Sequence, residues 1–138
     1  MPALYSETLL DHFRRPRNYG ALTAPDLSYE SFNPLCGDRI RLELKLENQT
    51  VTKAGFVGDG CAISIAAASL LTEMLLDTDA HFLQTITDDQ LIAALESDIK
   101  PARIQCALLP LEALRAALAI TTKGTKDTKG TKRISEGK

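Results

Sequence analysis

Hydrophobic and polar residues alternate most regularly between positions 39 and 47. Charged residues there separate four aliphatic side chains, which are Ile40, Leu42, Leu44 and Leu46. A period of two is typical of a strand with one buried face and one wet face. Asn48-Gln49 then predicts a turn, and residues 51–57 predict the returning strand of an antiparallel hairpin.

Helical patterns lie on both sides of this hairpin. Apolar residues recur at helical spacing over residues 3–15 and again over residues 103–119. Residues 62–76 are apolar almost all round, which is typical of a helix packed inside a domain. Leu27 and Tyr29 alternate with polar neighbours and predict one further short strand.

Two details of the helices are also predicted. Asp88 and Asp89 are candidate caps for a short helix that runs through Glu96. If the last long helix begins near Cys106, then Pro110 lies close to its first turn, where proline is tolerated.

The composition indicates one globular domain followed by a polar tail. Of the 138 residues, 44% are hydrophobic, which is enough for a core over residues 1–120. Residues 121–138 hold six of the 16 basic residues and two of the 18 acidic ones, with almost no apolar side chains. We expect this tail to be disordered.

Charge and hydropathy exclude some classes of function. Residues 1–120, without the basic tail, carry more acidic than basic side chains, which argues against nucleic acid as a partner. The sequence has no apolar run of about 18 residues, so no membrane span is predicted. The start of the chain lacks a signal-peptide pattern, and three cysteines is an odd number for a disulfide framework. Free or metal-bound thiols in a reducing cytoplasm fit better.

The three cysteines lie where elements meet. Cys36 precedes the predicted hairpin and Cys61 follows it, so an antiparallel pairing brings both, with Asp38, to one edge of the sheet. Cys61 and Cys106 lie near predicted helix starts, where a thiolate is favoured. Three thiolates and one carboxylate suit tetrahedral zinc or iron. The simpler alternative is three small buried side chains. His12 is expected to be structural or on the surface.

Four stretches of the sequence resemble the iron–sulfur cluster assembly scaffolds, the group of IscU, SufU and the NifU N-terminal domain. The resemblance covers residues 5 to about 119, and its motifs are Tyr5-Ser6-Glu7 through Pro16-Arg17-Asn18, Asn33-Pro34-Leu35-Cys36-Gly37-Asp38, Gly58-Asp59-Gly60-Cys61-Ala62-Ile63-Ser64 and Ala102-Arg103-Ile104-Gln105-Cys106-Ala107. It implies an α+β fold, a three-stranded antiparallel sheet packed by helices, which agrees with the patterns above. It also implies a zinc ion or nascent cluster on Cys36, Asp38, Cys61 and Cys106.

The motifs divide between two branches of that family. Gln105 stands where the IscU branch has a histidine, and the chaperone-binding stretch of that branch is absent around Pro101. The run from Pro101 to Cys106 looks like the SufU branch, whose members are zinc-bound sulfur acceptors. SufU proteins usually carry an insertion between the second and third cysteines, whereas here Cys61 and Cys106 are 45 residues apart, close to the IscU spacing.

The resemblance suggests a first hypothesis, sulfur transfer. A pyridoxal-phosphate-dependent cysteine desulfurase would pass sulfane sulfur to a thiolate of this protein, which is then an acceptor rather than a stand-alone enzyme. We expect Cys36 to be the acceptor, with Cys106 as the alternative. Asp38 would tune metal release, Arg103 would contact the desulfurase, and downstream iron–sulfur proteins would receive the product.

Two rival hypotheses use the same residues. In one, the protein is a scaffold on which a [2Fe–2S] cluster is assembled and passed on, with Fe²⁺ or the cluster in place of Zn²⁺. In the other, the residues form a structural zinc module without sulfur traffic. Gln105 weighs mildly against the scaffold.

Overall fold

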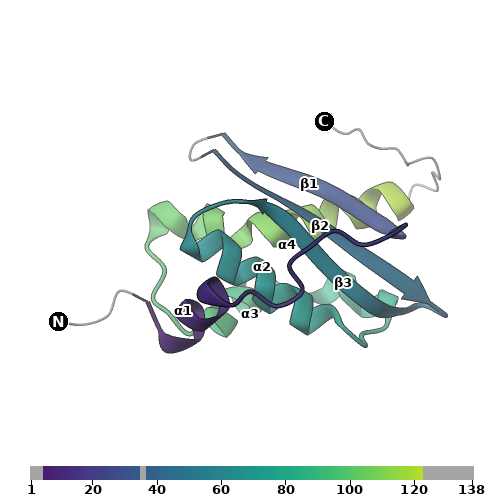
Figure 1. Ribbon diagram of the computed structural model, residues 1–138, viewed down its shortest axis with the longest axis horizontal. Coiled ribbons are helices and arrows are strands. Elements are labelled where there is room, and N and C mark those ends of the chain that lie inside the picture. Colours follow the sequence, from purple (N-terminus) through teal and green to yellow (C-terminus); the bar gives the residue numbers. More distant parts are fainter. Residues whose placement is uncertain (1–4, 35–36, 123–138) are drawn as a thin grey trace.

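The computed structural model describes residues 5–34 and 37–122 and shows a sheet covered by helices (Figure 1). The strands are β1 (Leu27–Asn33), β2 (Asp38–Glu47) and β3 (Thr50–Asp59), antiparallel in the order β1-β2-β3. The helices are α1 (Glu7–Arg14), α2 (Ala62–Leu75), α3 (Asp88–Leu95) and α4 (Ile104–Thr122), with short 3₁₀ turns η1 (Ala80–Thr85) and η2 (Pro101–Arg103). The predicted α+β fold is confirmed. No helix among these residues has the length and apolarity to span a membrane.

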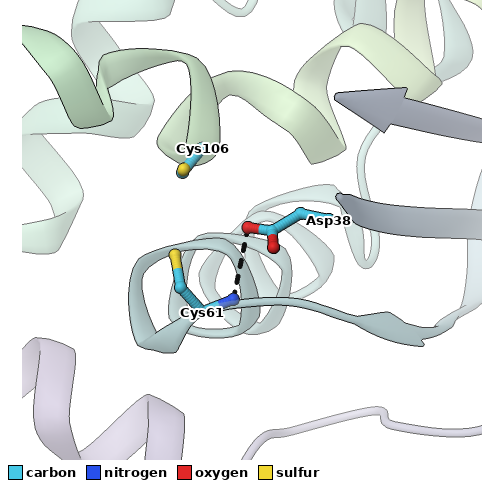
Figure 2. A group of neighbouring side chains, drawn as sticks. All are labelled: Asp38, Cys61 and Cys106. Carbon is cyan, nitrogen blue, oxygen red and sulfur yellow. Dashed lines mark hydrogen bonds between the residues drawn. The ribbon is translucent and has the colours of Figure 1, made fainter. Parts of the chain in front are cut away.

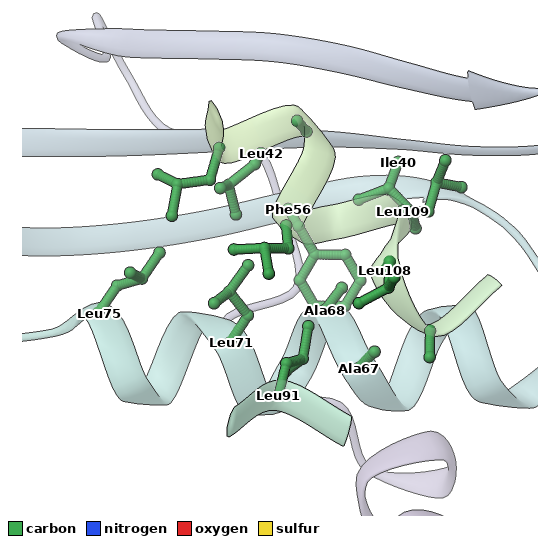
Figure 3. Close-up of a cluster of buried hydrophobic side chains, with 14 of the residues drawn as sticks. Ile40, Leu42, Phe56, Ala67, Ala68, Leu71, Leu75, Leu91, Leu108 and Leu109 are labelled. Atoms are coloured by element: carbon green, nitrogen blue, oxygen red, sulfur yellow. The ribbon is translucent and has the colours of Figure 1, made fainter. Parts of the chain in front are cut away.

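Helices α2 and α4 pack against each other and cover one face of the sheet. Helix α4 lies against β1 and β2, and α2 lies against β3, while α1 and α3 pack on α2 (Figure 1). The core between these layers is apolar, and Figure 3 shows its centre, including Leu42, Phe56, Leu71 and Leu109. Each fully buried side chain of this size contributes about 1.5–3 kcal/mol. This core fixes where both helices meet the sheet.

The predicted hairpin is confirmed, including its turn. Asn48 and Gln49 have φ angles of 53° and 68°. Two successive left-handed residues match the twist of a two-residue hairpin. The register sets Arg39 opposite Asp59, so the start of β2 and the end of β3 lie at the same sheet edge. This edge is where the cysteine motifs converge.

Glu43 differs from the prediction for its strand, because it lies on the face expected to be wet and is only 5% exposed. The segment before β1 covers it: Tyr19 bridges Phe56 in parallel, and the chain then passes over the sheet. The Glu43 carboxylate accepts a hydrogen bond from the Leu22 N–H at 2.7 Å and lies 3.2 Å from the Arg41 guanidinium. A strand pattern cannot reveal a loop that covers it.

The helix boundaries correct two further expectations. Thr87, not Asp88 or Asp89, caps α3, through a capping box with Gln90. Helix α4 begins at Ile104, two residues before Cys106, so Pro110 lies in its interior rather than near its first turn.

The end of α4 bears on the predicted boundary between domain and tail. The helix continues through Thr122, so residues 121 and 122 of the expected tail are helical. Residues 123–138 lie outside the described residues, and disorder there stays a prediction.

His12 is a buried structural residue, as expected. It is 6% exposed, and its Nδ1 lies 2.7 Å from the Ser69 hydroxyl of α2. Burial, aided by the positive charge of Arg17, lowers the pKa of His12, whereas Glu73 and Asp11 oppose this shift. A histidine that protonates less readily when folded costs stability as the pH falls below about 6.5, the pKa of an unfolded histidine.

We therefore expect the metal-free protein to lose stability between pH 7.5 and pH 5.5, partly through His12. In His12→Asn the fall in Tm over this range should be smaller than in the unaltered protein, whatever the starting Tm, as measured by circular dichroism. His81→Gln is the matched control, because His81 is the other histidine and its side chain is 80% exposed. An unchanged pH dependence in His12→Asn would contradict the assignment.

Candidate metal centre

The edge of the hairpin leads directly into helix α2. Strand β3 ends at Asp59, Gly60 follows, and Cys61 is the N-cap residue of α2. A β-carbon on Gly60 would lie 2.9 Å from the Ser64 side chain and 3.4 Å from the Asp38 carboxylate. Only glycine fits at position 60 without displacing Ser64 or Asp38. The close approach of β2 to α2 therefore depends on Gly60.

Asp38, Cys61 and Cys106 form one cluster from three elements. One carboxylate oxygen and the two sulfur atoms all lie within 4.8 Å of one another. Asp38 comes from the first residue of β2, Cys61 from the start of α2 and Cys106 from the first turn of α4, and Figure 2 shows them around a common point. Both sulfurs are free of disulfide bonds.

The donor set fits a tetrahedral metal ion. Zinc–sulfur bonds of about 2.3 Å in tetrahedral geometry place two sulfurs roughly 3.8 Å apart. The two sulfurs here lie within 4.8 Å, so a contraction of at most about 1 Å would let this cluster bind zinc. Asp38 is 8% exposed and Cys106 is 2% exposed, whereas Cys61 is half-buried. The described residues thus provide three ligands, with one edge of the cluster nearer to solvent.

The Asp38 carboxylate is held by α2. Its Oδ2 accepts hydrogen bonds from the Cys61 N–H at 3.2 Å (Figure 2) and from the Ser64 hydroxyl at 2.7 Å. A carboxylate at a helix N-terminus also meets the positive end of the helix dipole. These interactions compensate for burying its charge.

Arg103 lies beside the two thiols. Its hydrogen bond to the Cys106 sulfur, with attraction to Cys61 and Cys106, raises the pKa of Arg103 above its ordinary value. The side chain comes from η2, immediately before α4, and residue 103 is exposed. A positive charge thus lies next to the sulfur atoms of the cluster.

The structure brings together three of the four residues that the sequence singled out as ligands. Asp38, Cys61 and Cys106 form the cluster, Arg103 lies next to it, and Cys36 lies outside the described residues. Sequence reasoning missed Ser64, whose hydroxyl is buried at the centre of the site. Its signal was the spacing of three residues after Cys61, which puts both side chains on one side of the helix start.

Comparisons with known proteins identify the family of the chain. Residues 4–127 match the family described as the NifU-like N terminal domain. The zinc-dependent sulfurtransferase SufU of Bacillus subtilis is 36% identical over 136 residues, covering 86% of this chain and 92% of the relative. The iron–sulfur cluster assembly scaffold protein IscU of Azotobacter vinelandii is 36% identical over 118 residues, covering 83% of this chain and 91% of the relative.

A solved structure agrees in fold. The N-terminal part of a nitrogen-fixing NifU-like protein from Brucella abortus superposes with a TM-score of 0.74, covering 88% of this chain and 96% of that one, at 19% identity. The family match spans most of the chain, and both relatives are similar over nearly their whole length. The chain therefore belongs to the NifU-like N-terminal domain family of iron–sulfur cluster assembly proteins.

Proposed function

We propose that this protein is a zinc-dependent sulfur acceptor, which takes persulfide sulfur from a cysteine desulfurase for iron–sulfur cluster assembly. The observation that carries the proposal is the cluster of one carboxylate and two thiols within 4.8 Å. The similarity to a zinc-dependent sulfurtransferase over 86% of the chain supports it.

Four residues would hold the metal in this proposal: Asp38, Cys61, Cys106 and Cys36. Cys36 precedes Asp38 by two residues, so covalent geometry keeps their Cα atoms within about 7 Å. When bound, zinc would keep the sulfur ligands as thiolates and link β2, α2 and α4.

Burial argues against Cys106, the alternative sulfur acceptor. Cys106 is 2% exposed, so its sulfur is poorly placed to meet a persulfide on another protein. The Cys36 thiolate would attack the outer sulfur of the desulfurase persulfide, and a new S–S bond forms as the old one breaks. Cys36 then carries the persulfide and the desulfurase cysteine leaves as a thiolate, with no net oxidation.

The proposed partners follow from this step. A pyridoxal-phosphate-dependent cysteine desulfurase would donate the sulfur, and downstream iron–sulfur proteins would receive the product. The exposed Arg103, next to the thiols, would contact the desulfurase near the reacting sulfurs. A cytoplasmic, reducing location remains a prediction from the odd number of cysteines.

A second candidate is a scaffold that assembles a [2Fe–2S] cluster on the same residues. The similarity to an IscU scaffold at 36% identity favours it, and so does Asp38, whose oxygen binds iron less tightly than a thiolate would. Anaerobic incubation with iron and sulfide separates the candidates: a stable cluster in the visible spectrum supports the scaffold.

The first prediction concerns metal content and desulfurase turnover. We expect about one zinc ion per chain by elemental analysis and a faster desulfurase when the protein is present. In Cys36→Ala, turnover should fall to the rate of the desulfurase alone, because the accepting thiolate is gone. Mass spectrometry after trapping should find one added sulfur atom on Cys36 of the unaltered protein.

Three outcomes would count against the proposal. Normal stimulation by Cys36→Ala would overturn the acceptor assignment. Iron with acid-labile sulfide in the purified protein would favour the scaffold. Zinc without any effect on the desulfurase would indicate a structural zinc module.

The second prediction tests Arg103 as a partner contact. In Arg103→Gln, the concentration of this protein needed for half-maximal stimulation should rise about fivefold to tenfold, because a contact worth roughly 1 kcal/mol or more is lost. Arg115→Gln is the matched control, since Arg115 pairs with Asp88 at 2.8 Å outside the cluster. Equal effects of both substitutions would argue against a specific contact.

A further inference from the structure

The Ser64 hydroxyl contacts all three residues of the described cluster. Its oxygen lies 2.7 Å from the Asp38 carboxylate, 3.2 Å from the Cys106 carbonyl and 3.7 Å from the Cys61 sulfur. Ser64 is fully buried, in the first turn of α2. A serine has a single O–H to donate, so the carboxylate and the carbonyl compete for it. The shorter distance favours the carboxylate.

Pro110 explains why the Cys106 carbonyl is available to Ser64. In an α-helix the carbonyl of residue 106 accepts a hydrogen bond from the N–H of residue 110. Proline has no N–H, so this bond cannot form inside α4. The interior proline therefore directs a helix carbonyl from the cluster residue Cys106 to the hydroxyl that also holds Asp38.

The two hydrogen bonds from α2 to Asp38 end on the same carboxylate oxygen. Oδ2 accepts from the Ser64 hydroxyl and from the Cys61 N–H, and the carboxylate faces the two sulfurs (Figure 2). Hydrogen bonds of this kind orient a metal ligand, and removing such a partner typically costs about 10–100-fold in metal affinity. Ser64 is the one side chain that reaches both Asp38 and α4 in this way among the described residues.

We propose that Ser64 is a positioning residue that aims the Asp38 carboxylate at the metal. The Cys106 carbonyl, which cannot accept a hydrogen bond from Pro110, is the alternative acceptor for the Ser64 hydroxyl. When the Asp38 carboxylate turns away from the metal, the buried Ser64 hydroxyl can still donate a hydrogen bond to the Cys106 carbonyl. The cost of releasing the Asp38 ligand is thereby lowered. This inference rests on the metal site of the proposed function.

The test measures zinc affinity by competition with a chromogenic chelator, and the Tm of the metal-free protein. Ser64→Ala should bind zinc about tenfold or more weakly and should lower the Tm by about 5 °C. Ser69→Ala is the matched control: Ser69 is also fully buried on α2, but its hydroxyl contacts His12 and the Arg17 N–H. It should lower the Tm and leave zinc affinity unchanged.

A double variant separates positioning from folding. Pro110→Ala supplies the missing N–H to the Cys106 carbonyl, so Ser64→Ala/Pro110→Ala should regain Tm while zinc affinity stays low. Recovery of both would show that Ser64 acts only through stability and would overturn the proposal. Unchanged zinc affinity in Ser64→Ala would also overturn it. A lack of zinc binding by the unaltered protein would instead overturn the proposed function, and this inference with it.

Discussion

The hydrogen bonds that the Asp38 carboxylate accepts from the start of α2 are the interactions on which the site depends. Asp38 begins β2, whereas Cys61 and Ser64 belong to the first turn of α2. Bonds to a charged group contribute about 1.5–3 kcal/mol each, and more is lost when a buried partner remains unsatisfied. The same carboxylate thus joins the sheet to the helix and faces the two sulfurs. Stability and ligand geometry are coupled at one residue.

The apolar core makes that coupling possible. Helices α2 and α4 are packed on one face of the sheet by fully buried side chains such as Phe56, Leu71 and Leu109 (Figure 3). Small residues such as Ala67 and Ala68 let the helices approach closely. The polar cluster lies where the sheet and both helices converge. Polar groups that would be costly to bury elsewhere satisfy one another here.

The sequence supported the fold and the cluster through local signals. The alternation around Ile40 and the Asn48-Gln49 turn fixed the hairpin, and the hairpin brought Asp38 and Cys61 together. What could not be predicted depends on tertiary contacts. Burial of Glu43 requires a loop from elsewhere in the chain. The N–H that Pro110 lacks matters here only because the Ser64 hydroxyl lies beside the Cys106 carbonyl.

The distribution of solvent exposure around the cluster bears on how sulfur could be exchanged there. Asp38 and Cys106 are buried and Cys61 is half-buried, so three of the four proposed ligands belong to the framework of the domain. Gly37, beside the proposed acceptor Cys36, has a φ of 78° and open space where a side chain would begin. In the proposed mechanism, the buried residues Asp38 and Cys106 would hold the metal while the acceptor thiolate exchanges the sulfur.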